Sequence, residues 1–445
     1  MAKTGYALSE SNKDNILPNP EIKIMNNKTF MFPRRYILVA GTFIMSLMLY
    51  IDRACISAAK DPMAETLGLT DGQMGWVLSI FALGYSLFQT PAGLLIDKFG
   101  PRRMLSAIVA FWSLFTALTG AAWNFISLLV IRFLFGAGEA GAFPGASRAF
   151  FSWIPLQERG IVQGINFSGS RLGAAFALPV IALLIETVGW RNSFMMQGSL
   201  VFLWAILWYI FFRDLPENHK AVPDSEKNYI IANRQKSDSS AGAVKSLTAG
   251  RLLGSKNMWL AMGQYFGSNF TFFFCLTWLL PHLKSKYSLD LVEAGLYASA
   301  PLIFGAIGNW VSGFMVDHIY KKGGWKMSRR VPAIIGFSLV IIGMTASVYQ
   351  ENIVGSIVFL SIAVFGADMT LSPSWSFCID IGKNHAGTVS GTMNMAGNIG
   401  SFATALAFPY LKAWTGSVVP FFFTGAVLAL LSIFCWLKMD STKEL

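Results

Sequence analysis

Six ionisable side chains interrupt long apolar stretches of this 445-residue sequence. They are Asp52, Arg53, Arg132, Glu139, Arg171 and Asp368. A charge at the centre of a membrane-spanning helix costs ~2.5–3.5 kcal/mol or more, so each is a functional candidate by default. Three are acids and three are bases, so their charges sum to zero. Static ion pairs that only join helices are the structural alternative.

The chemistry that these residue types favour is recognition of an anion together with a proton. Arginine binds a carboxylate bidentately, and a buried carboxylate can take up a proton near neutral pH. Glu139 follows Arg132 by seven residues, which places both side chains on one face of a helix. At 1.5 Å per residue, Asp52 lies ~24 Å from the N-terminal side of its segment, at a depth similar to that of Arg132. The sequence therefore predicts that Arg132 and Glu139 face one cavity.

The elements that must position these residues are membrane-spanning helices. Hydrophobic residues make up 54% of the chain and charged residues only 13%, whereas a soluble domain carries about a quarter charged residues. This excludes a cytosolic enzyme, a nucleic-acid-binding domain and a disulfide-rich secreted module. Twelve apolar stretches are long enough to span a membrane, which takes about 20 residues. They cover about 36–58, 74–96, 104–123, 125–147, 160–186, 192–212, 257–283, 292–316, 332–349, 353–377, 386–412 and 417–437.

The only long polar connection lies between the sixth and seventh stretches, and we expect it to be a flexible connector. It divides the chain into two halves of six helices each. The predicted parts are an N-terminal tail 1–35, a six-helix bundle 36–212, the connector 213–256, a second six-helix bundle 257–437 and a C-terminal tail 438–445.

The distribution of basic residues predicts the orientation in the membrane. With a cytosolic N-terminus, 27 of the 35 Lys and Arg fall in cytosolic segments and five outside. The positive-inside rule then places both termini in the cytosol and explains the net charge of +11 without a nucleic-acid partner. We expect a monomer in a bacterial inner membrane. The expected partners are the lipid bilayer, a small organic anion and protons, and we expect no metal or cofactor.

The two halves of the sequence repeat each other. The paired segments are 93–97 with 313–317, 143–144 with 372–373, and Gly164 with Gly391. The members of each pair are separated by a nearly constant length of chain, which is unlikely to arise by chance. Two parallel six-helix repeats predict two bundles with a central site and alternating access by rocking of one bundle against the other.

The run Gly-x-x-x-Asp-x-x-Gly-x-Arg-Arg at 93–103 resembles the cytoplasmic loop signature of the major facilitator superfamily. Gly93 lets helices pack closely, and Asp97 can pair with a basic residue or a helix N-terminus of the other bundle. We therefore predict a gating role for this motif and its partial repeat. The residues concerned are Asp97, Arg102, Arg103 and Asp317.

Longer motifs narrow the resemblance to the anion:cation symporter family within this superfamily. They are Tyr50-Ile51-Asp52-Arg53, the run 132–144, the stretch 274–281 and Gly391-Thr392-Met393-Asn394. The likeness extends over about 36–437, and bacterial galactonate, glucarate and hexuronate carriers belong to this family, as do eukaryotic organic-anion carriers. It implies an all-α fold with twelve transmembrane helices in two bundles. It also implies proton-coupled symport of an organic anion, such as a sugar acid, rather than an enzyme. Sodium-coupled or exchange-type carriage and a non-transporting membrane sensor are the alternatives.

The resemblance also implies roles for individual residues. Asp52 and Glu139 match the two protonatable carboxylates of the family, and Arg53 matches a ligand of the substrate carboxylate. Arg132 matches an arginine of the network on the fourth helix. The other residues that the resemblance places at the substrate site are Tyr50, Tyr85, Ser170, Ser372, Ser374, Trp375 and one of Asn394 and Asn398.

Three positions depart from the family pattern. Galactonate-type carriers have a glutamine where this chain has Ser170, the next residue is the charged Arg171, and Asp368 is a further unmatched charge. Arg171 and Asp368 lie on helices of opposite bundles at depths that differ by only a few ångströms. One hypothesis is that they pair to help close an inner gate. The other is that Arg171 binds a second carboxylate, so that the substrate is a dianion.

Overall fold

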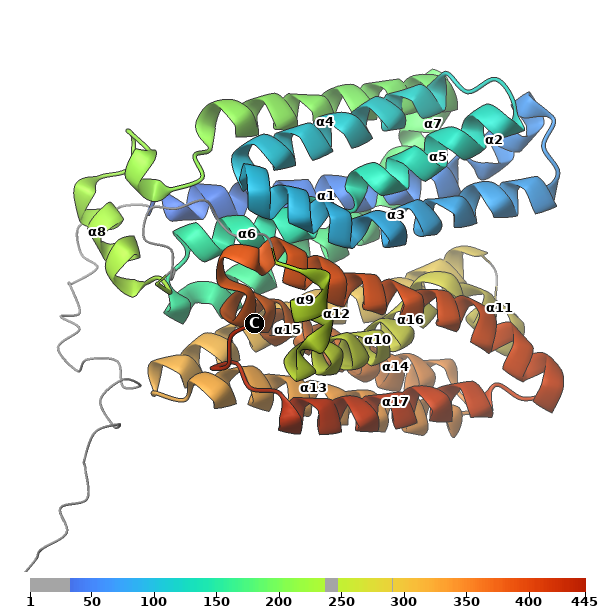
Figure 1. The fold of residues 1–445 in the computed structure, drawn as a ribbon. Helices are drawn as coiled ribbons and strands as arrows, with labels where there is room; N and C mark the ends of the chain where they lie inside the picture. The colour runs from blue at the N-terminus through green and yellow to red at the C-terminus, as the bar shows by residue number, and fades with distance from the viewer. Residues whose placement is uncertain (1–32, 237–246, 290) are drawn as a thin grey trace, which may run out of the picture.

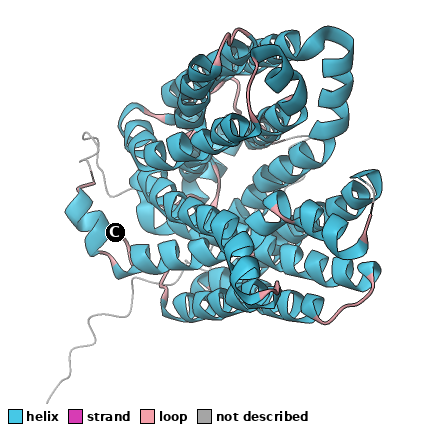
Figure 2. Ribbon diagram, turned by 90° about the vertical axis from the view of Figure 1, so that its right-hand side faces the viewer, coloured by secondary structure: helices cyan, strands magenta, loops and turns pink. Residues whose placement is uncertain are grey.

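The computed structural model describes residues 33–236, 247–289 and 291–445, so most of the predicted tail 1–35 lies outside the described residues. These residues form α-helices, short 3₁₀ turns and loops, and contain no β-strand (Figure 2). The prediction of an all-α protein is confirmed.

The first half of the chain forms one bundle, drawn from blue to green in the upper part of Figure 1. Its helices are α1 (Arg35–Ala58), α2 (Lys60–Leu67), α3 (Asp71–Phe99), α4 (Pro101–Gly120), α5 (Phe125–Glu139), α6 (Ala142–Trp153) and α7 (Arg159–Phe211). The element α7 contains Gly189 with φ 78° and ψ 158°, a conformation that glycine adopts at no steric cost. This break separates two helices, 159–188 and 190–211, which correspond to two of the predicted spans.

The second half forms the other bundle, in the lower part of the same view (Figure 1). Its helices are α10 (Lys256–Thr277), α11 (Leu279–Tyr287), α12 (Leu291–Lys321), α13 (Trp325–Val348), α14 (Ile353–Met369), α15 (Leu371–Gly382), α16 (Ala386–Thr415) and α17 (Val419–Lys438). Between the bundles the chain forms α8 (Asp224–Asn233) and α9 (Ala249–Gly254). Below, the end of the molecule that carries α8 and the C-terminus is called the connector end, and the opposite end the distal end.

Prolines explain two helix breaks that lie at matching places in the two halves. Pro144 is the third residue of α6, and Pro373 is the third residue of α15. A proline has no N–H to donate and its ring clashes with the carbonyl four residues earlier, so it interrupts the preceding helix. The interruption ends α5 at Glu139 and ends α14 at Met369, one residue after Asp368. Each half therefore carries a carboxylate in the last turn of a broken helix.

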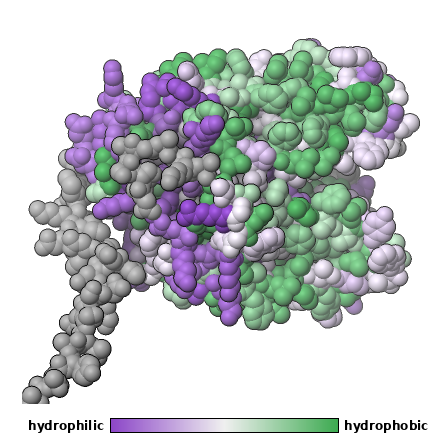
Figure 3. All heavy atoms as spheres, in the orientation of Figure 1, coloured by the Kyte–Doolittle hydropathy of each residue, from purple (hydrophilic) through white to green (hydrophobic). Residues whose placement is uncertain are grey.

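The outer surface of both bundles is apolar. Nine segments of the described chain are long and apolar enough to cross a membrane. Phe314 and Phe402 are 65% and 62% exposed, as expected for side chains that contact lipid rather than water. Figure 3 shows hydrophobic residues over the sides of both bundles and hydrophilic residues gathered at the connector end. This is the surface of a multi-pass membrane protein.

The connector is partly folded, so the prediction that it is flexible throughout is wrong for α8. Glu226 of α8 is fully buried and accepts hydrogen bonds from the backbone N–H groups of Arg34 and Arg35 and from Nη1 of Arg35. The other guanidinium nitrogens of Arg35 bind Glu158, at 2.8 and 2.9 Å. The carboxylate of Glu226 therefore fastens α8 to the start of α1.

We expect Glu226→Ala to release α8 and to destabilise the connector end by ~3–5 kcal/mol, because it leaves part of a buried charge network unpaired. Limited proteolysis of the connector and the melting temperature of the purified protein measure the effect. Asp224→Ala is the matched control on the same helix. Its side chain is 91% exposed, and the exposed pair with Lys227 is worth ~0–1 kcal/mol. Equal behaviour of the two variants would contradict the fastening role of Glu226.

Candidate functional site

A small cavity of about 40 Å³ lies between the two bundles. This volume is below the roughly 300–1,000 Å³ of typical small-molecule sites. The first half contributes Tyr50, Arg53, Tyr85, Phe143, Phe167 and Arg171 to its lining. The second half contributes Tyr265, Ser268, Asn269, Phe272, Phe273, Asp368, Leu371, Trp375, Asn394 and Asn398. The lining is mostly aromatic, with a small set of polar and charged groups.

Arg53 brings a positive charge to the cavity wall and is held by Glu139. Its Nε donates to Oε2 of Glu139 at 2.7 Å, and the carboxylate is fully buried behind it. Nη2 of Arg53 and Oε1 of Glu139 have no hydrogen-bond partner in the structure. The guanidinium therefore keeps unused N–H capacity beside the cavity.

Aromatic rings surround the guanidinium of Arg53. Its central carbon lies 4.4 Å from the ring centroid of Tyr85, 5.0 Å from that of Phe81 and 5.1 Å from that of Tyr50. These distances are within reach of cation–π attraction. The three rings therefore help to fix the orientation of the guanidinium.

Asp52 faces away from the cavity, although it precedes Arg53 in the chain. Its Oδ2 accepts hydrogen bonds from Nε1 of Trp112 at 3.2 Å and from Oγ1 of Thr116 at 3.4 Å, both on α4. Successive residues of a helix differ by about 100° in direction, which explains how the two neighbours reach different surroundings. The predicted proton carrier is thus buried inside the first bundle.

Arg132 also lies outside the cavity lining. Its guanidinium carbon sits 4.6 Å from the ring of Phe135 and 5.3 Å from that of Phe81, and its Nε is buried without a partner. The expected common cavity of Arg132 and Glu139 is therefore not observed, because aromatic side chains of α3 and α5 cover Arg132. Glu139 itself reaches the cavity only through Arg53.

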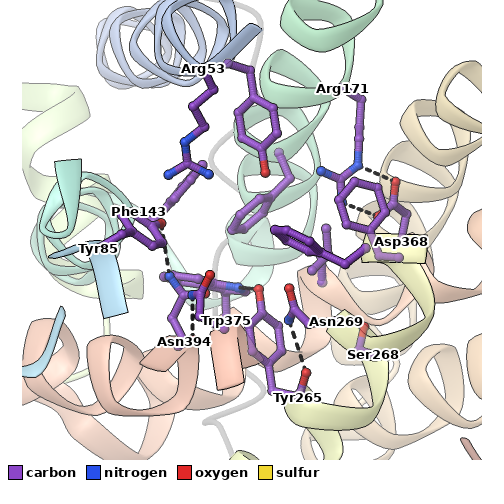
Figure 4. A pocket seen from close by; sticks show the side chains of 16 residues that line it. Arg53, Tyr85, Phe143, Arg171, Tyr265, Ser268, Asn269, Asp368, Trp375 and Asn394 are labelled. Atoms are coloured by element: carbon purple, nitrogen blue, oxygen red, sulfur yellow. Dashed lines mark hydrogen bonds and ion pairs between the residues drawn. The ribbon is translucent and has the colours of Figure 1, made fainter. Parts of the chain in front are cut away.

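Arg171 and Asp368 form a second charge pair, and this pair joins the two bundles. Nε of Arg171 on α7 donates to Oδ2 of Asp368 on α14 at 2.7 Å, and Nη2 donates to Oδ1 at 2.5 Å. Both side chains are almost fully buried and both line the cavity. The ring of Phe272 covers the guanidinium at 3.6 Å. Figure 4 shows the pair beside the cavity, with Arg53 on the same side.

Polar groups of the second half lie across the cavity from the two arginines (Figure 4). The hydroxyl of Tyr265 accepts a hydrogen bond from Nε1 of Trp375 at 2.9 Å. Nδ2 of Asn394 donates to the hydroxyl of Tyr85 at 3.4 Å, which links the bundles again. Asn394 and Asn398 both line the cavity, so the lining does not separate the two candidates.

The three predicted serines lie outside the lining. Ser170 and Ser374 donate to backbone carbonyls one turn earlier, and Ser372 donates to the carbonyl of Asn309. Sequence reasoning did not place several lining residues at the site. They are Phe143, Phe167, Ser268, Phe272, Phe273 and Leu371. Phe272 and Phe273 belong to a phenylalanine-rich run that reads equally well as lipid-facing.

The predicted gating acids bind helix N-termini of the opposite bundle at the connector end. Asp97 of α3 accepts from the backbone N–H groups of Gly387 and Thr388 at the start of α16. Asp317 of α12 accepts from those of Gly160 and Ile161 at the start of α7. Free N–H groups and the helix dipole make these termini favourable for carboxylates.

The contacts of Asp97 and Asp317 are equivalent in the two halves of the chain, as are the sequence motifs that form them. The acids belong to the paired segments 93–97 and 313–317, and each binds the first turn of a helix in the other half. Glycines make the contacts possible. A Cβ added to Gly93 would lie 2.4 Å from the carbonyl oxygen of Gly387, and one added to Gly160 would lie 2.5 Å from that of Gly313. Helix backbones of the two bundles therefore touch at this end.

The two basic gating candidates lie at the same end but belong to another cluster. The backbone N–H of Arg102 donates to Asp214 at 2.7 Å, and Nε of Arg102 donates to the carbonyl of Tyr209. Burial raises the pKa of Asp214 above its ordinary value, and nearby Arg102 and Arg103 oppose that shift. Arg102 therefore helps to order the start of the connector, and the charge of Arg103 acts on the same carboxylate.

A further ion-pair cluster spans the bundles beside Asp317. Asp380 of α15 binds Nη1 of Arg159 at 2.6 Å and Nε of Arg329 at 2.8 Å. Gln235 of the connector accepts from Arg159 and donates to the carbonyl of Asp380. Sequence reasoning did not include this cluster, because its members lie in loops or at helix ends that read as ordinary charged turns.

The comparisons with known proteins agree with the fold. The family model of the Major Facilitator Superfamily matches residues 42–405 of this chain. A probable sulfoacetate transporter of Cupriavidus necator is 34% identical over 92% of this chain and 96% of its own length. A probable galactarate/D-glucarate transporter of Escherichia coli is 32% identical over 88% and 89%. A hexuronate transporter of Bacillus subtilis is 29% identical over 84% and 88%.

Solved structures show the same architecture at low sequence identity. The proton:xylose symporter XylE, with bound 6-bromo-6-deoxy-D-glucose, aligns with a TM-score of 0.72 at 15% identity, over 92% of this chain and 96% of that chain. The human organic anion transporter MFSD10 aligns with a TM-score of 0.68 at 14% identity, over 91% and 100%. The chain therefore belongs to the major facilitator superfamily and is homologous to its organic-anion and sugar-acid transporters.

Proposed function

We propose that this protein is a proton-coupled symporter of small organic anions that works by alternating access. The observation that carries the proposal is Arg53, a guanidinium at the cavity wall held by the buried carboxylate of Glu139. An anion that replaces Glu139 on Arg53 leaves a buried negative charge without its partner. That charge is costly unless a proton neutralises it. Binding of the anion and of the proton are thereby linked.

Asp52 is the second proton carrier in this proposal. Both of its hydrogen-bond donors, Trp112 and Thr116, are neutral, so it can be accommodated with or without a proton. Entry of a monoanion against an inside-negative potential costs ~2.3 kcal/mol per 100 mV. Two protons per monoanion convert the process into net entry of positive charge, which the potential favours, and two protons per dianion make it electroneutral, so that the potential does not oppose it. Arg132, which lies against the aromatic rings of Phe81 and Phe135, supports this charge balance.

The connector end is the cytosolic gate in this proposal. The excess of Lys and Arg in the segments at that end supports its cytosolic placement. Asp97 and Asp317 latch the gate through helix N-termini, while Arg102 and Arg103 order the adjoining loop. The substrate then enters from the distal side, and rocking of the bundles breaks these latches to release it into the cytosol.

The substrate class is that of sugar acids and related small carboxylates or sulfonates. The names of the homologous transporters and the two cavity arginines support this class. The aromatic rings of Tyr50, Tyr85 and Trp375 form apolar parts of the cavity wall. The side-chain amides of Asn394 and Asn398 on α16 form polar parts. We further propose twelve membrane crossings in a bacterial inner membrane, and a monomer, since one chain supplies both walls of the cavity.

Uptake into proteoliposomes tests the function. Purified protein is reconstituted, the outside is made acidic, and labelled sulfoacetate, galactarate, galactonate and glucuronate are offered one at a time. We expect one or more of these anions to accumulate together with acidification of the lumen. Accumulation that follows a sodium gradient and ignores the pH gradient would contradict proton coupling.

A further inference from the structure

We propose that Arg171 is a second acid-binding site, which Asp368 occupies until a dianionic substrate displaces it. The inference rests on the proposed function, because it concerns the same cavity. It narrows the substrate class to small organic dianions with one acid group for Arg53 and another for Arg171. Suitable classes are dicarboxylates and sulfonated carboxylates.

The first argument is that the cavity contains the same unit twice. Arg53 is paired with Glu139, and Arg171 is paired with Asp368. The spacing along the chain from Glu139 to Asp368 equals the spacing from Pro144 to Pro373 in the repeat. Each carboxylate lies in the last turn of a helix that the proline breaks. Asp368 therefore occupies, in the second half, the place of Glu139 in the first.

The second argument concerns what can reach each guanidinium from the cavity. Both arginines line the cavity and point into it from the same side (Figure 4). Their hydrogen bonds to carboxylates leave part of each fork available, since Nη2 of Arg53 is unpartnered and Nη1 of Arg171 has only a 3.4 Å contact to Ser170. A guanidinium that is planar and prepositioned by an aromatic ring is suited to bind a carboxylate or sulfonate. For Arg171 this ring is Phe272.

The third argument is that the pair must break during transport. Arg171 belongs to the first bundle, whereas Asp368 is built into the second. Its carboxylate fits against Gly305 of α12, where an added Cβ would lie 2.2 Å from Oδ2. Movement of the bundles separates the partners, and a buried charge that loses its partner is strongly destabilising. In the proposed cycle a second acid on the substrate replaces Asp368 on Arg171, so that this guanidinium keeps an anionic partner.

Binding of the second acid group to Arg171 therefore also releases the contact that holds the two bundles together. A monoanion satisfies Arg53 but leaves the bond between α7 and α14 in place. A dianion satisfies both arginines and removes that bond. The cavity is thereby selective for substrates with two acid groups, and no cavity residue other than Arg171 needs to bind the second group.

Matched ligand pairs test the inference on purified protein. Galactarate and galactonate share a six-carbon chain and differ in one acid group, and sulfoacetate and acetate differ in the same way. Titration calorimetry at fixed pH measures the affinity for each. We expect wild type to bind the diacid of at least one pair about tenfold or more tightly than the monoacid. A preference for the monoacid, or none, would overturn the second site while leaving the proposed function intact. Binding of neither member of either pair would overturn the proposed function itself, and the second site with it.

The variants separate a ligand site from a simple gate. Arg171→Gln is expected to remove the diacid preference and to keep the affinity for the monoacid. Because that variant leaves Asp368 unpaired and could fail to fold, the double variant Arg171→Gln with Asp368→Asn removes both charges together. The double variant should also bind diacid and monoacid within about twofold of each other. Arg191→Gln is the control on the same α7 element, since Arg191 binds the carbonyls of Gly120 and Ala122. A folded double variant that retains the wild-type preference would overturn the inference.

Discussion

Glu139→Gln is expected to abolish uptake driven by a proton gradient while exchange of substrate across the membrane continues. Glutamine keeps the shape of the side chain and an acceptor for Nε of Arg53, which now lies 2.7 Å from Oε2. It cannot carry a negative charge or exchange a proton. Arg53 therefore loses its anionic competitor, and the anion binds without waiting for a proton.

Two assays on the same proteoliposomes measure this separation. Accumulation under an imposed pH gradient should fall to the level of empty liposomes. Counterflow, in which labelled substrate exchanges with unlabelled substrate inside, should stay within about threefold of wild type, a difference of only ~0.7 kcal/mol. Glu186→Gln is the matched control, since Glu186 is an exposed acid near the distal end of the first helix of α7. Unchanged accumulation would remove Glu139 from the coupling mechanism, and loss of counterflow as well would assign it a structural role.

The position of a residue along its helix was predictable from the sequence, whereas its direction around the helix axis was not. Counting residues placed Asp52 and Arg53 together, yet one binds Trp112 on α4 and the other faces the cavity. The same limit applies to Arg132, which shares a helix face with Glu139 but is covered by Phe81 and Phe135. Which neighbour a side chain meets depends on packing between helices, and a single sequence does not encode that locally.

The internal repeat indicated which residues are equivalent in the two bundles, whereas composition indicated only the class of protein. It relates the acids Asp97 and Asp317, and the structure shows both bound to helix N-termini of the opposite bundle. The repeat also relates Glu139 to Asp368, a correspondence that becomes meaningful once both are seen at proline-broken helix ends. By contrast, the folded part of the connector depends on contacts such as Arg35 with Glu226, which lie far apart in the chain and which no local pattern indicates.

The closed connector end also contains buried polar groups that have no partner. Both side-chain polar atoms of Gln89 on α3 and of Gln163 on α7 lack hydrogen bonds in the structure. Each unpaired buried group costs ~1–3 kcal/mol. Gln89 lies beside Gly391, and Gln163 directly precedes Gly164, where the bundles touch. In the proposed alternating-access cycle, opening of this end to water would satisfy these groups, and their cost in the closed form offsets part of the stabilisation from the Asp97 and Asp317 contacts.

Arg53→Lys is expected to reduce the affinity for the transported anion at least about tenfold, or ~1.4 kcal/mol, although the charge is kept. The guanidinium of Arg53 uses Nε on Glu139, has Nη2 free and lies against three aromatic rings. An ammonium lacks the planar fork that binds an acid group through two N–H groups in fixed directions, and it stacks less well on rings.

Titration of purified protein with the anion that is taken up, at fixed pH and ionic strength, measures the change. Arg191→Lys is the matched control, because Arg191 makes its hydrogen bonds to backbone carbonyls of α4 and the loop after it and does not line the cavity. Melting temperatures of both variants exclude a general loss of folding. An affinity of Arg53→Lys within about threefold of wild type would mean that the anion senses only a positive charge. Planar two-point recognition at Arg53, and with it the parallel drawn to Arg171, would then be wrong.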